Sequence, residues 1–430
     1  MKQKVFIGLS GGVDSAVSAH LLLEQGYEVV GVFMRNWAGS DGKDPNCTQR
    51  QDREAAQAVA EHLGIEFKVL DFVDDYMESV MKPFLSAYKA GLTPNPDMLC
   101  NSEIKFGVFR DACLADGADF IATGHYAKLE RTNSETQLHM AKDQNKDQTY
   151  FLAGVATHQF DNVLFPLGDL TKAEVREIAE KINLPNAKRK DSQGICFVGK
   201  INVREYIRQQ LGEKPGDIVD IDTNEVVGKH NGIWLLTIGQ RHGLDLGGLN
   251  TPYYVCKKDV DTDTVYVCNG RDHEELNKTE IMVTDINLIG DDLTVEKLMQ
   301  LKGVTTRIRH RGERIMVGAV IRPHDYNPAV GAVSRWRDKP RVRENLRPHD
   351  DINNPITGAT SRRRDDISDG TVDTPTDDRV SLTTDPTEHT THPTEHTLTL
   401  RHTSPHWAPT AGQTLVFYHK GRYLGSGIMI

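Results

Sequence analysis

The sequence predicts an α/β protein, with a doubly wound parallel sheet followed by a small β-rich domain and a C-terminal β-barrel. Apolar runs of strand length alternate with helical patterns through residues 1–198, which is typical of a parallel sheet covered by helices on both faces. Beyond Lys200, short strand-like runs are separated by turn residues, as in small barrels. Ligands of open parallel sheets bind at the carboxyl ends of the strands, so a site is expected there.

Strands and helices alternate in the first domain, which is expected at residues 1–198. Its buried strands are predicted at 5–7, 28–34, 67–70 and 120–126, and its helices at 16–23, at 52–62, beyond residue 74 and at 172–184. The last helix begins with a capping box, in which Thr171 is the cap and Glu174 lies three residues on. The loops after Leu9, Phe33 and Thr123 should therefore share a cleft.

A glycine-rich turn connects the first strand to the first helix. Residues 8–15 read Gly-Leu-Ser-Gly-Gly-Val-Asp-Ser. Gly11 and Gly12 let a ligand approach the N–H groups of the first helical turn, which suit a phosphate or pyrophosphate, and Ser10 and Ser15 can add donors. The lysine-bearing phosphate loop and the spaced dinucleotide motif are both absent from this turn. An ordinary glycine-rich turn is the alternative, which the six ordered positions from Ser10 to Ser15 disfavour.

Length and composition limit the class of protein. A chain of 430 residues is expected to form two or three domains. No stretch approaches the roughly 20 apolar residues of a membrane span, and the N-terminus enters its first strand at once, so we expect a cytoplasmic protein without a signal peptide. Six cysteines without metal-like spacing argue against a disulfide scaffold or a zinc site. The net charge of −10 requires that any nucleic acid be met by a local basic surface.

The second and third domains are expected at residues 199–279 and 280–430. Strands are predicted at 216–222, 233–238, 253–256, 264–267, 303–308, 315–320, 414–418 and 423–430. Between about 324 and 406, Thr, Pro, Asp, Arg and His dominate. Apolar residues there are too sparse to offset chain entropy, which predicts a disordered insertion. Its irregular histidines are more typical of a solvated spacer than of a metal site.

Two cysteines lie in loops of the first domain where a thiolate would be favoured. Cys100 follows a proline-rich loop and is expected at or near a helix N-terminus, whose dipole lowers the pKa of a thiol. Cys196 follows three basic residues at 188–190, whose charge also stabilises thiolate. The alternative for each is a buried structural cysteine. As a pair, one can carry sulfur while the other resolves the resulting persulfide or disulfide.

Six motifs occur in a fixed order: Ser-Gly-Gly-Val-Asp-Ser at 10–15, Gly-Val-Phe-Met-Arg-Asn-Trp at 31–37, Asn-Pro-Asp-Met-Leu-Cys-Asn at 95–101, Ala-Thr-Gly-His-Tyr-Ala at 122–127, Lys-Asp-Gln-Thr-Tyr-Phe-Leu at 146–152 and Asp-Ser-Gln-Gly-Ile-Cys-Phe at 191–197. Together they resemble the bacterial tRNA-specific 2-thiouridylase family, within the ATP pyrophosphatase superfamily. The resemblance covers residues 1 to about 320 and resumes near 410. It implies an adenine nucleotide alpha hydrolase-like fold and ATP-dependent transfer of sulfur to C2 of the wobble uridine, at position 34 of tRNA.

The resemblance also implies roles for individual residues. ATP, with Mg²⁺, would be held by Gly8, Leu9, Ser10, Gly11, Gly12, Val13, Asp14, Ser15, Met34 and Gly124. The target base would be contacted by Asn95, Pro96 and Asp97, and the rest of the tRNA by His125, Lys146, Asp147, Gln148, Arg309, His310 and Gln413. Cys196 would carry the persulfide, and Cys100 would be the nucleophile that works with it and can end in a disulfide with it.

The chemistry of such a reaction fits these residues. Adenylation lets the C2 oxygen leave as AMP, while helix-terminal amides and a metal ion stabilise the pyrophosphate. Sulfur from Cys196 then attacks C2, either directly or after Cys100 frees it as sulfide. A sulfur-relay protein or cysteine desulfurase would load Cys196. The alternatives are a ligase or amidotransferase of the same superfamily, which would need neither cysteine, and a non-catalytic tRNA-binding or sulfur-carrying protein, which would not need the whole glycine turn.

A polyanionic partner requires cations, and Arg307, Arg309 and Arg311 recur at period two on a predicted strand. Near the C-terminus the family has an Ala-x-x-Pro-Gly-Gln turn, whereas residues 408–413 read Ala-Pro-Thr-Ala-Gly-Gln. Gln413 is nevertheless the expected tRNA contact of this turn. The aromatic rings of Trp37 and Tyr126 are expected to be buried rather than stacked on bases.

Overall fold

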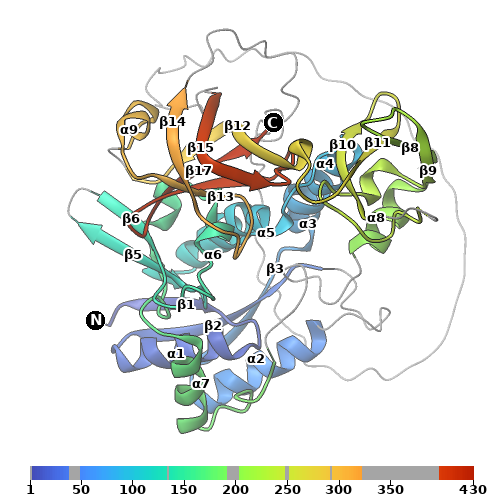
Figure 1. Cartoon of the computed structure of the whole chain (residues 1–430). Helices are drawn as coiled ribbons and strands as arrows, with labels where there is room; N and C mark the ends of the chain where they lie inside the picture. The colour runs from blue at the N-terminus through green and yellow to red at the C-terminus, as the bar shows by residue number, and fades with distance from the viewer. Residues whose placement is uncertain are drawn as a thin grey trace, which may run out of the picture. The chain divides into compact units, whose positions relative to one another are not determined.

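The computed structural model describes residues 2–37, 49–132, 135–190, 203–246, 251–290, 293–321 and 397–430. A five-stranded parallel sheet with the order β3-β2-β1-β4-β7 forms the centre of the first domain (Figure 1). Its strands are β1 (Lys4–Gly8), β2 (Glu28–Arg35), β3 (Glu66–Asp71), β4 (Phe120–Ala122) and β7 (Val163–Leu164). The predicted strand at 120–126 is therefore shorter than expected, because residues 123–126 form a loop of the site described below.

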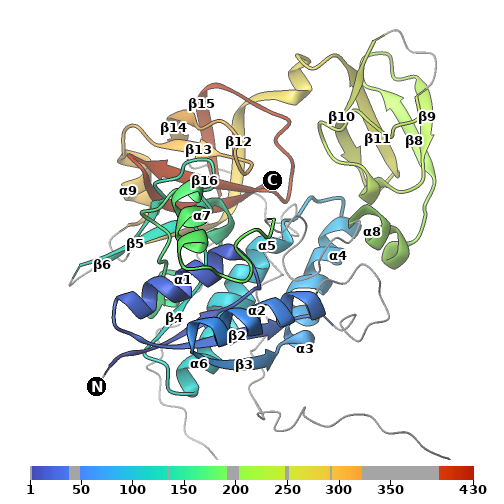
Figure 2. The ribbon, with the colours of Figure 1, turned by 90° about the horizontal axis from the view of Figure 1, so that it is seen from below.

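Helices cover both faces of this sheet, which confirms the predicted doubly wound fold. Val5 and Ile7 of β1 pack in one core with α1 (Val13–Glu24), α2 (Gln49–Leu63) and α7 (Lys172–Lys181). These three helices lie below β1 and β2 in Figure 1 and in front of them in Figure 2. Phe6 points to the opposite core because side chains alternate along a strand. That core is covered by α3 (Val73–Tyr76), α4 (Lys82–Lys89), α5 (Pro96–Leu99), α6 (Phe109–Ala115) and the π-helical segments Met77–Met81 and Cys100–Val108.

The central β-rich region begins with α8 (Val203–Leu211) and contains a four-stranded sheet in the order β10-β11-β8-β9. Its strands are β8 (Gly216–Asp220), β9 (Val226–His230), β10 (Tyr253–Asp259) and β11 (Thr264–Asn269). The strand predicted at 233–238 is wrong, because Ile233–Leu235 forms a short 3₁₀ turn. All three of its side chains are buried and the Trp234 indole donates to the Gly212 carbonyl at 3.3 Å, an inward orientation of consecutive residues that an alternating strand does not allow.

Six strands close into the C-terminal barrel, since β12 pairs with both β15 and β17. They are β12 (Asn277–Leu288), β13 (Thr305–Arg307), β14 (Ile315–Ile321), β15 (Leu398–Trp407), β16 (Thr414–His419) and β17 (Arg422–Met429), with α9 (Val295–Gln300) beside them. Strand β15 lies inside the range that the sequence assigned to the insertion, 324–406. Leu398 and Leu400 face the barrel core, although Thr and His dominate the composition around them. The rest of that range, 324–396, is outside the described residues.

A hairpin of the first domain joins the barrel sheet, which the sequence did not predict. Its strands are β5 (Ala127–Thr132) and β6 (Glu135–Met140), and β6 pairs with β17 through His139 opposite Arg422 and Leu138 opposite Tyr423. Short 3₁₀ turns at Thr149–Leu152, Thr157–Phe160 and Glu274–Leu276 complete the described elements. Across the described ranges, no helix has the length and apolar character that crossing a membrane requires.

Candidate active site

The glycine-rich turn lies at the carboxyl end of β1, where strand order reverses between β1 and β4. Within the turn, the Ser15 hydroxyl accepts from the Ser10 N–H at 3.2 Å and donates to the Gly12 carbonyl at 3.1 Å. The Ser10 hydroxyl accepts from the Gly12 N–H at 3.3 Å. Gly11 has a φ of +75°, a conformation that glycine adopts without strain. The two serines thus hold the turn in one conformation ahead of the N-terminus of α1.

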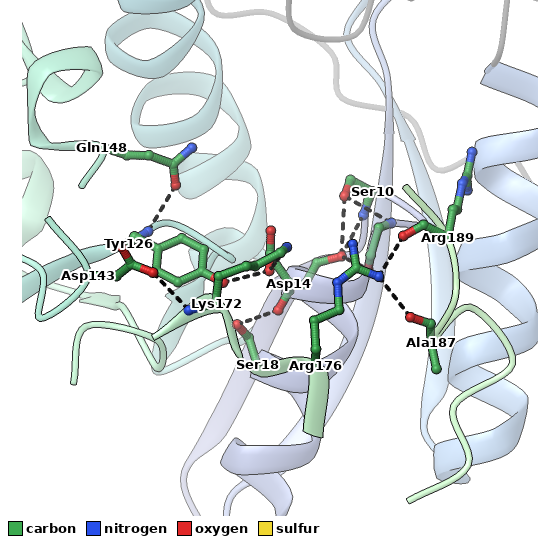
Figure 3. A network of polar contacts seen from close by, with 12 residues as sticks. Ser10, Asp14, Ser18, Tyr126, Asp143, Gln148, Lys172, Arg176, Ala187 and Arg189 are labelled. Carbon is green, nitrogen blue, oxygen red and sulfur yellow. Dashed lines mark hydrogen bonds and ion pairs between the residues drawn. The ribbon is translucent and has the colours of Figure 1, made fainter. Parts of the chain in front are cut away.

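The Gly11 carbonyl is held from outside the turn. It accepts from Asn186 Nδ2 at 2.9 Å and from Arg189 Nη1 at 3.1 Å. Arg189 also forms an ion pair with Asp52 of α2, and Arg176 Nη1 donates to the carbonyls of residues 187 and 189 at 2.8 Å each (Figure 3). The basic run 188–190 was expected to favour a thiolate at Cys196, whereas its central arginine fixes the glycine turn.

The loop after β4 meets the glycine turn, as the sequence predicted, and β2 approaches it through Met34, whereas most of the loop after β2 lies outside the described residues. A Cβ atom added at Gly124 would lie 2.8 Å from the backbone nitrogen of Ser15, so the loop after β4 touches the first turn of α1. A Cβ atom added at Gly8 would lie 2.9 Å from Met34 Cε at the end of β2. Only glycine permits the approach of these two backbones at residue 124. The carboxyl ends of β1, β2 and β4 therefore form one site.

Asp14 is the centre of a polar network on this site (Figure 3). Its Oδ1 atom accepts from the Tyr126 hydroxyl at 2.8 Å and from Lys172 Nζ at 2.6 Å. The backbone N–H of Lys172 donates to Asp143 Oδ2 at 2.9 Å, and that of Tyr126 donates to Gln148 Oε1 at 2.9 Å. Lys172 was not among the site residues predicted from the sequence. A cation in the first turn of a helix opposes the helix dipole, and this is the signal that a carboxylate partner was needed.

Two of the residues assigned to tRNA are buried by protein. Asp147 is 1% exposed, accepts from the Thr149 hydroxyl at 2.9 Å and lies 3.6 Å from Arg307 Nη1. Burial raises the pKa of Asp147, although hydrogen bonds oppose this shift. His125 is 7% exposed and its Nδ1 lies 2.7 Å from the Thr123 hydroxyl. Burial lowers the pKa of His125 well below its usual value, so the ring is neutral at pH 7.

Cys100 lies one turn deeper in its helix than the sequence suggested. Asn95 caps α5, since its Oδ1 accepts from the Asp97 N–H at 3.0 Å, and Pro96 is the first helical residue. Because α5 continues without a break into the π-helical segment, Cys100 is in the second turn and is fully buried. The dipole effect declines within the first turn. Cys196 is outside the described residues, so its pairing with Cys100 stays a prediction.

The barrel approaches Cys100 through the turn that follows β13. Asn101 Nδ2 donates to the Phe151 carbonyl at 2.8 Å, and the rings of Phe151 and His310 lie 4.6 Å apart. The Tyr150 hydroxyl donates to the carbonyl of Ile308 at 2.9 Å. Burial lowers the pKa of His310 to about 4, so this ring is also neutral at pH 7. The helix that carries Cys100 and the turn that carries His310 are thus parts of one packed unit.

The predicted basic face of a strand is wrong. β13 ends at Arg307, whose side chain is buried beside Asp147. Arg309 donates from Nη2 to the Ala408 carbonyl at 2.7 Å and covers the ring of Trp407. Arg311 has a φ of +60°, outside strand geometry, and its Nε donates to the Asn145 carbonyl at 3.1 Å. Period two predicted a single face, but the strand ends at Arg307, the first residue of the pattern, and the chain turns before Arg309 and Arg311.

The C-terminal turn lies beside residues 92–93, just before the segment 95–97 that the resemblance assigns to the target base, despite its missing proline. The Thr93 N–H donates to the Ala411 carbonyl at 3.0 Å, and a Cβ atom at Gly412 would lie 2.7 Å from Leu92 Cβ. Gln413 follows directly, and its Oε1 is buried without a hydrogen-bond partner among the described residues. Tyr126 is buried, as expected, and Trp37 is half-buried against Tyr206 of α8.

Comparisons with known proteins identify relatives of the chain. A family model described as "tRNA methyl transferase HUP domain" matches residues 3–200, and one described as "tRNA methyl transferase PRC-barrel domain" matches residues 204–269. Curated relatives named tRNA-specific 2-thiouridylase include proteins of Geobacillus kaustophilus, 44% identical over 75% of this chain and 86% of the relative, and of Mycoplasma mycoides subsp. mycoides, 48% identical over 68% and 81%. A third, from Pseudomonas fluorescens, is 45% identical over 72% and 82%.

Solved structures resemble the chain over about half of its length. An NMN synthetase from Francisella tularensis matches with a TM-score of 0.30 and 16% identity, over 50% of this chain and 79% of its own. A 4-thiouridine synthetase in complex with RNA and bound ATP matches with a TM-score of 0.30 and 16% identity, over 48% of this chain and 50% of its own.

Proposed function

The chain belongs to the family of tRNA-specific 2-thiouridylases, and we propose that it uses ATP to adenylate the C2 carbonyl of the wobble uridine of tRNA and then replaces that oxygen by sulfur. The observation that carries the proposal is the convergence of the glycine turn after β1, the loop with Gly124 after β4, and Met34 of β2 at the carboxyl ends of these strands. A pyrophosphate bound at the N-terminus of α1 would lie at the switch point of the sheet.

The residues of the glycine turn fit ATP. The first N–H groups of α1, a helix of 12 residues capped by Gly12 without a side-chain hydrogen bond, are available to phosphate oxygens. Mg²⁺ takes few protein ligands when it binds nucleotide phosphates, and the described residues contain no cluster of three metal-ligating side chains. We assign one carboxylate to it, that of Asp14: its side-chain hydrogen bonds with Tyr126 and Lys172 both fall on Oδ1, and among the described residues this leaves Oδ2 for a metal ion.

We place the target uracil beside residues 95–97, the cap and first residues of α5, near the barrel. Uracil offers one N–H donor, and two buried acceptors in this region, Asn101 Oδ1 and Gln413 Oε1, have no partner among the described residues. A buried acceptor without a donor costs free energy, so a ligand that supplies one is favoured. Arg309 and His310 would contact the adjoining RNA from the barrel. His310 would do so as a neutral ring, by stacking and hydrogen bonding.

Sulfur transfer can take place in two orders, which differ in whether the Cys196 persulfide or free hydrogen sulfide attacks C2. Uracil O2 attacks the α-phosphate of ATP and pyrophosphate leaves, after which sulfur forms a bond to C2 and AMP departs with the original oxygen. If the terminal sulfur of the Cys196 persulfide attacks C2 directly, Cys100 then attacks Cys196 Sγ and releases the thiouridine. If Cys100 attacks Cys196 Sγ first, hydrogen sulfide is the nucleophile. Both orders leave a Cys100–Cys196 disulfide that a reductant must open.

A persulfide donor must load Cys196 before each turnover, so the partner would be a sulfur-relay protein or a cysteine desulfurase. The reaction would take place in the cytoplasm, which holds tRNA and ATP. Cys100→Ser and Cys196→Ser should each abolish 2-thiouridine while tRNA-dependent pyrophosphate release persists. Cys113→Ser is the matched control, since Cys113 is an equally buried thiol of the neighbouring helix α6.

Two measurements test this function. Mass spectrometry of tRNA nucleosides reads thiolation, and wild-type thiouridine from the Cys196→Ser protein would refute the mechanism. Pyrophosphate release with and without tRNA separates the alternatives. A ligase or amidotransferase for a small substrate would release pyrophosphate without tRNA, and a binding or sulfur-carrying protein would release none.

A further inference from the structure

The segment that precedes the target-base loop is held from two sides by other parts of the chain. It begins at Gly91, directly after α4, with a φ of +76°. The Gly91 N–H donates to the Tyr88 carbonyl at 2.9 Å and the Leu92 N–H to the Ala87 carbonyl at 3.0 Å, which is the usual glycine termination of a helix. Two residues later, the Thr93 N–H donates to the Ala411 carbonyl of the barrel.

Strand β10 of the central region holds the other side. Lys258 Nζ donates to the Gly91 carbonyl at 3.0 Å. Next to it, a Cβ atom at Gly91 would lie 2.5 Å from Val260 Cγ2, so the end of β10 packs on the backbone of this glycine. The ammonium group also lies at the C-terminal end of α4, where the helix dipole favours a cation.

Lys258 has no carboxylate partner among the described residues. Its only polar contact within those ranges is the Gly91 carbonyl. Burial lowers the pKa of Lys258 to about 8, with no opposing charge to raise it. The Lys258 side chain is half-buried, and withdrawing an ammonium group from water without a counter-ion is unfavourable. Its neighbour Lys257 is exposed and lies over the ring of Tyr266.

We propose that Lys258 is a positioning residue of the reaction, which holds the Gly91 carbonyl so that the loop 95–97 and Cys100 face the target uridine. The path is short, because only residues 92–94 separate Gly91 from Asn95, the cap of α5. A shift of the Gly91 carbonyl therefore moves the start of the helix that carries Cys100. Displacements of about 1 Å at a reacting group can lower a rate roughly 100-fold. This inference rests on the proposed function of the loop and the cysteine.

Three variants of the full-length protein test the role. Lys258→Met keeps the length of the side chain and removes the charge, and we expect kcat for 2-thiouridine formation to fall about 10- to 30-fold, with KM for ATP unchanged. Lys258→Arg should recover most of the loss, because a guanidinium group can still donate to the Gly91 carbonyl. Lys257→Met is the matched control and should behave as wild type.

The salt dependence of tRNA binding distinguishes positioning from a direct phosphate contact. If Lys258 only positions the loop, the slope of log affinity against log salt is the same in Lys258→Met and wild type. A slope reduced by about one unit, together with uniformly weaker tRNA binding, would show that Lys258 neutralises a phosphate and would overturn the inference.

Hydrogen exchange tests the positioning without reference to catalysis. In Lys258→Met, protection of the Leu92 and Thr93 amides should fall at least tenfold, whereas Lys257→Met should leave it unchanged. Unchanged protection in Lys258→Met would overturn the inference even if activity were lost. If the wild-type protein formed no 2-thiouridine, the proposed function would fail, and the exchange result would still report whether Lys258 holds the loop.

Discussion

The close contact at Gly124 gives a quantitative prediction for the ATP site. In Gly124→Ala the new methyl group would lie 2.8 Å from the Ser15 nitrogen, 3.0 Å from the Asp14 carbonyl carbon and 3.1 Å from Ser15 Cα. All three atoms belong to the backbone of the first turn of α1. In Gly8→Ala the new methyl group would lie 2.9 Å from Met34 Cε, the far end of a flexible side chain, and 3.9 Å from its next neighbour.

These contacts predict different costs for the same added atom. Ordinary van der Waals contact begins near 3.4 Å, so Gly124→Ala must separate two backbones by about 0.6 Å. Overpacking of this kind costs about 1–3 kcal/mol, and displacement of the phosphate-binding amides should raise Kd for ATP at least tenfold, since about 1.4 kcal/mol corresponds to a factor of ten. A rotation of the Met34 side chain relieves the contact in Gly8→Ala, which should cost less than about 1 kcal/mol and change Kd less than about threefold.

Calorimetric titration of ATP measures the two dissociation constants, and thermal unfolding checks that both variants are folded at the temperature used. Pyrophosphate release in the presence of tRNA gives an independent readout of the same site. Wild-type affinity in Gly124→Ala would refute the reasoning, because it would mean that the loop after β4 can move away from α1 without consequence. A larger defect in Gly8→Ala than in Gly124→Ala would refute it as well.

Three further predictions concern charged and titratable side chains. Arg189→Met removes the hydrogen bond to the Gly11 carbonyl and the ion pair with Asp52, which should weaken ATP binding by about 2 kcal/mol or roughly 30-fold. Calorimetric titration of ATP should show no change for Lys188→Met, a variant of the exposed neighbour. Equal effects of the two variants would contradict the role of Arg189 in holding the glycine turn. His310→Asn should weaken tRNA binding without changing its salt dependence, because the ring is neutral at pH 7; a salt slope lowered by about one unit would argue for a charged contact. Burial lowers the pKa of His406 to about 4, so the unfolded chain binds a proton that the folded chain excludes, and the free energy of unfolding falls as pH drops from about 6.5 towards 4. Urea unfolding of His406→Gln should show a weaker pH dependence of this free energy. An unchanged pH dependence would contradict the role of this histidine.

Local patterns predicted the first domain because its elements are determined by local chemistry. The capping box at Thr171 and Glu174 is present, with the Glu174 N–H donating to the Thr171 hydroxyl at 3.3 Å. The glycine turn follows β1 as expected, and the predicted loop after β4 meets it at Gly124. In each case the deciding interaction joins residues only a few positions apart, or follows from the direction of neighbouring parallel strands.

The failures involve contacts between distant residues. Residues 233–238 have the composition of a strand, but the space between α8 and the central sheet requires consecutive buried side chains. Strand β15 was not predicted because it lies in a Thr- and His-rich segment, whose buried polar residues form hydrogen bonds with other strands of the barrel. The rings of His402 and His406 both lie within 3.0 Å of the Thr306 hydroxyl. No local pattern reveals a hydrogen bond between residues 100 positions apart.

The triplet 146–148 shows why a motif implied by resemblance does not by itself give the role of each residue. Its three members follow one another in sequence, yet Asp147 is buried against Arg307, Gln148 holds the backbone of Tyr126 in the ATP site, and Lys146 is half-buried. Two of these contacts join the site to other elements, since Arg307 belongs to the barrel and Tyr126 contacts Asp14. RNA bound beside this triplet would therefore contact the residues that link the barrel to the proposed ATP site, through Asp147–Arg307 and Gln148–Tyr126. We expect this connection to couple tRNA binding to the proposed adenylation, and pyrophosphate release with and without tRNA measures that coupling.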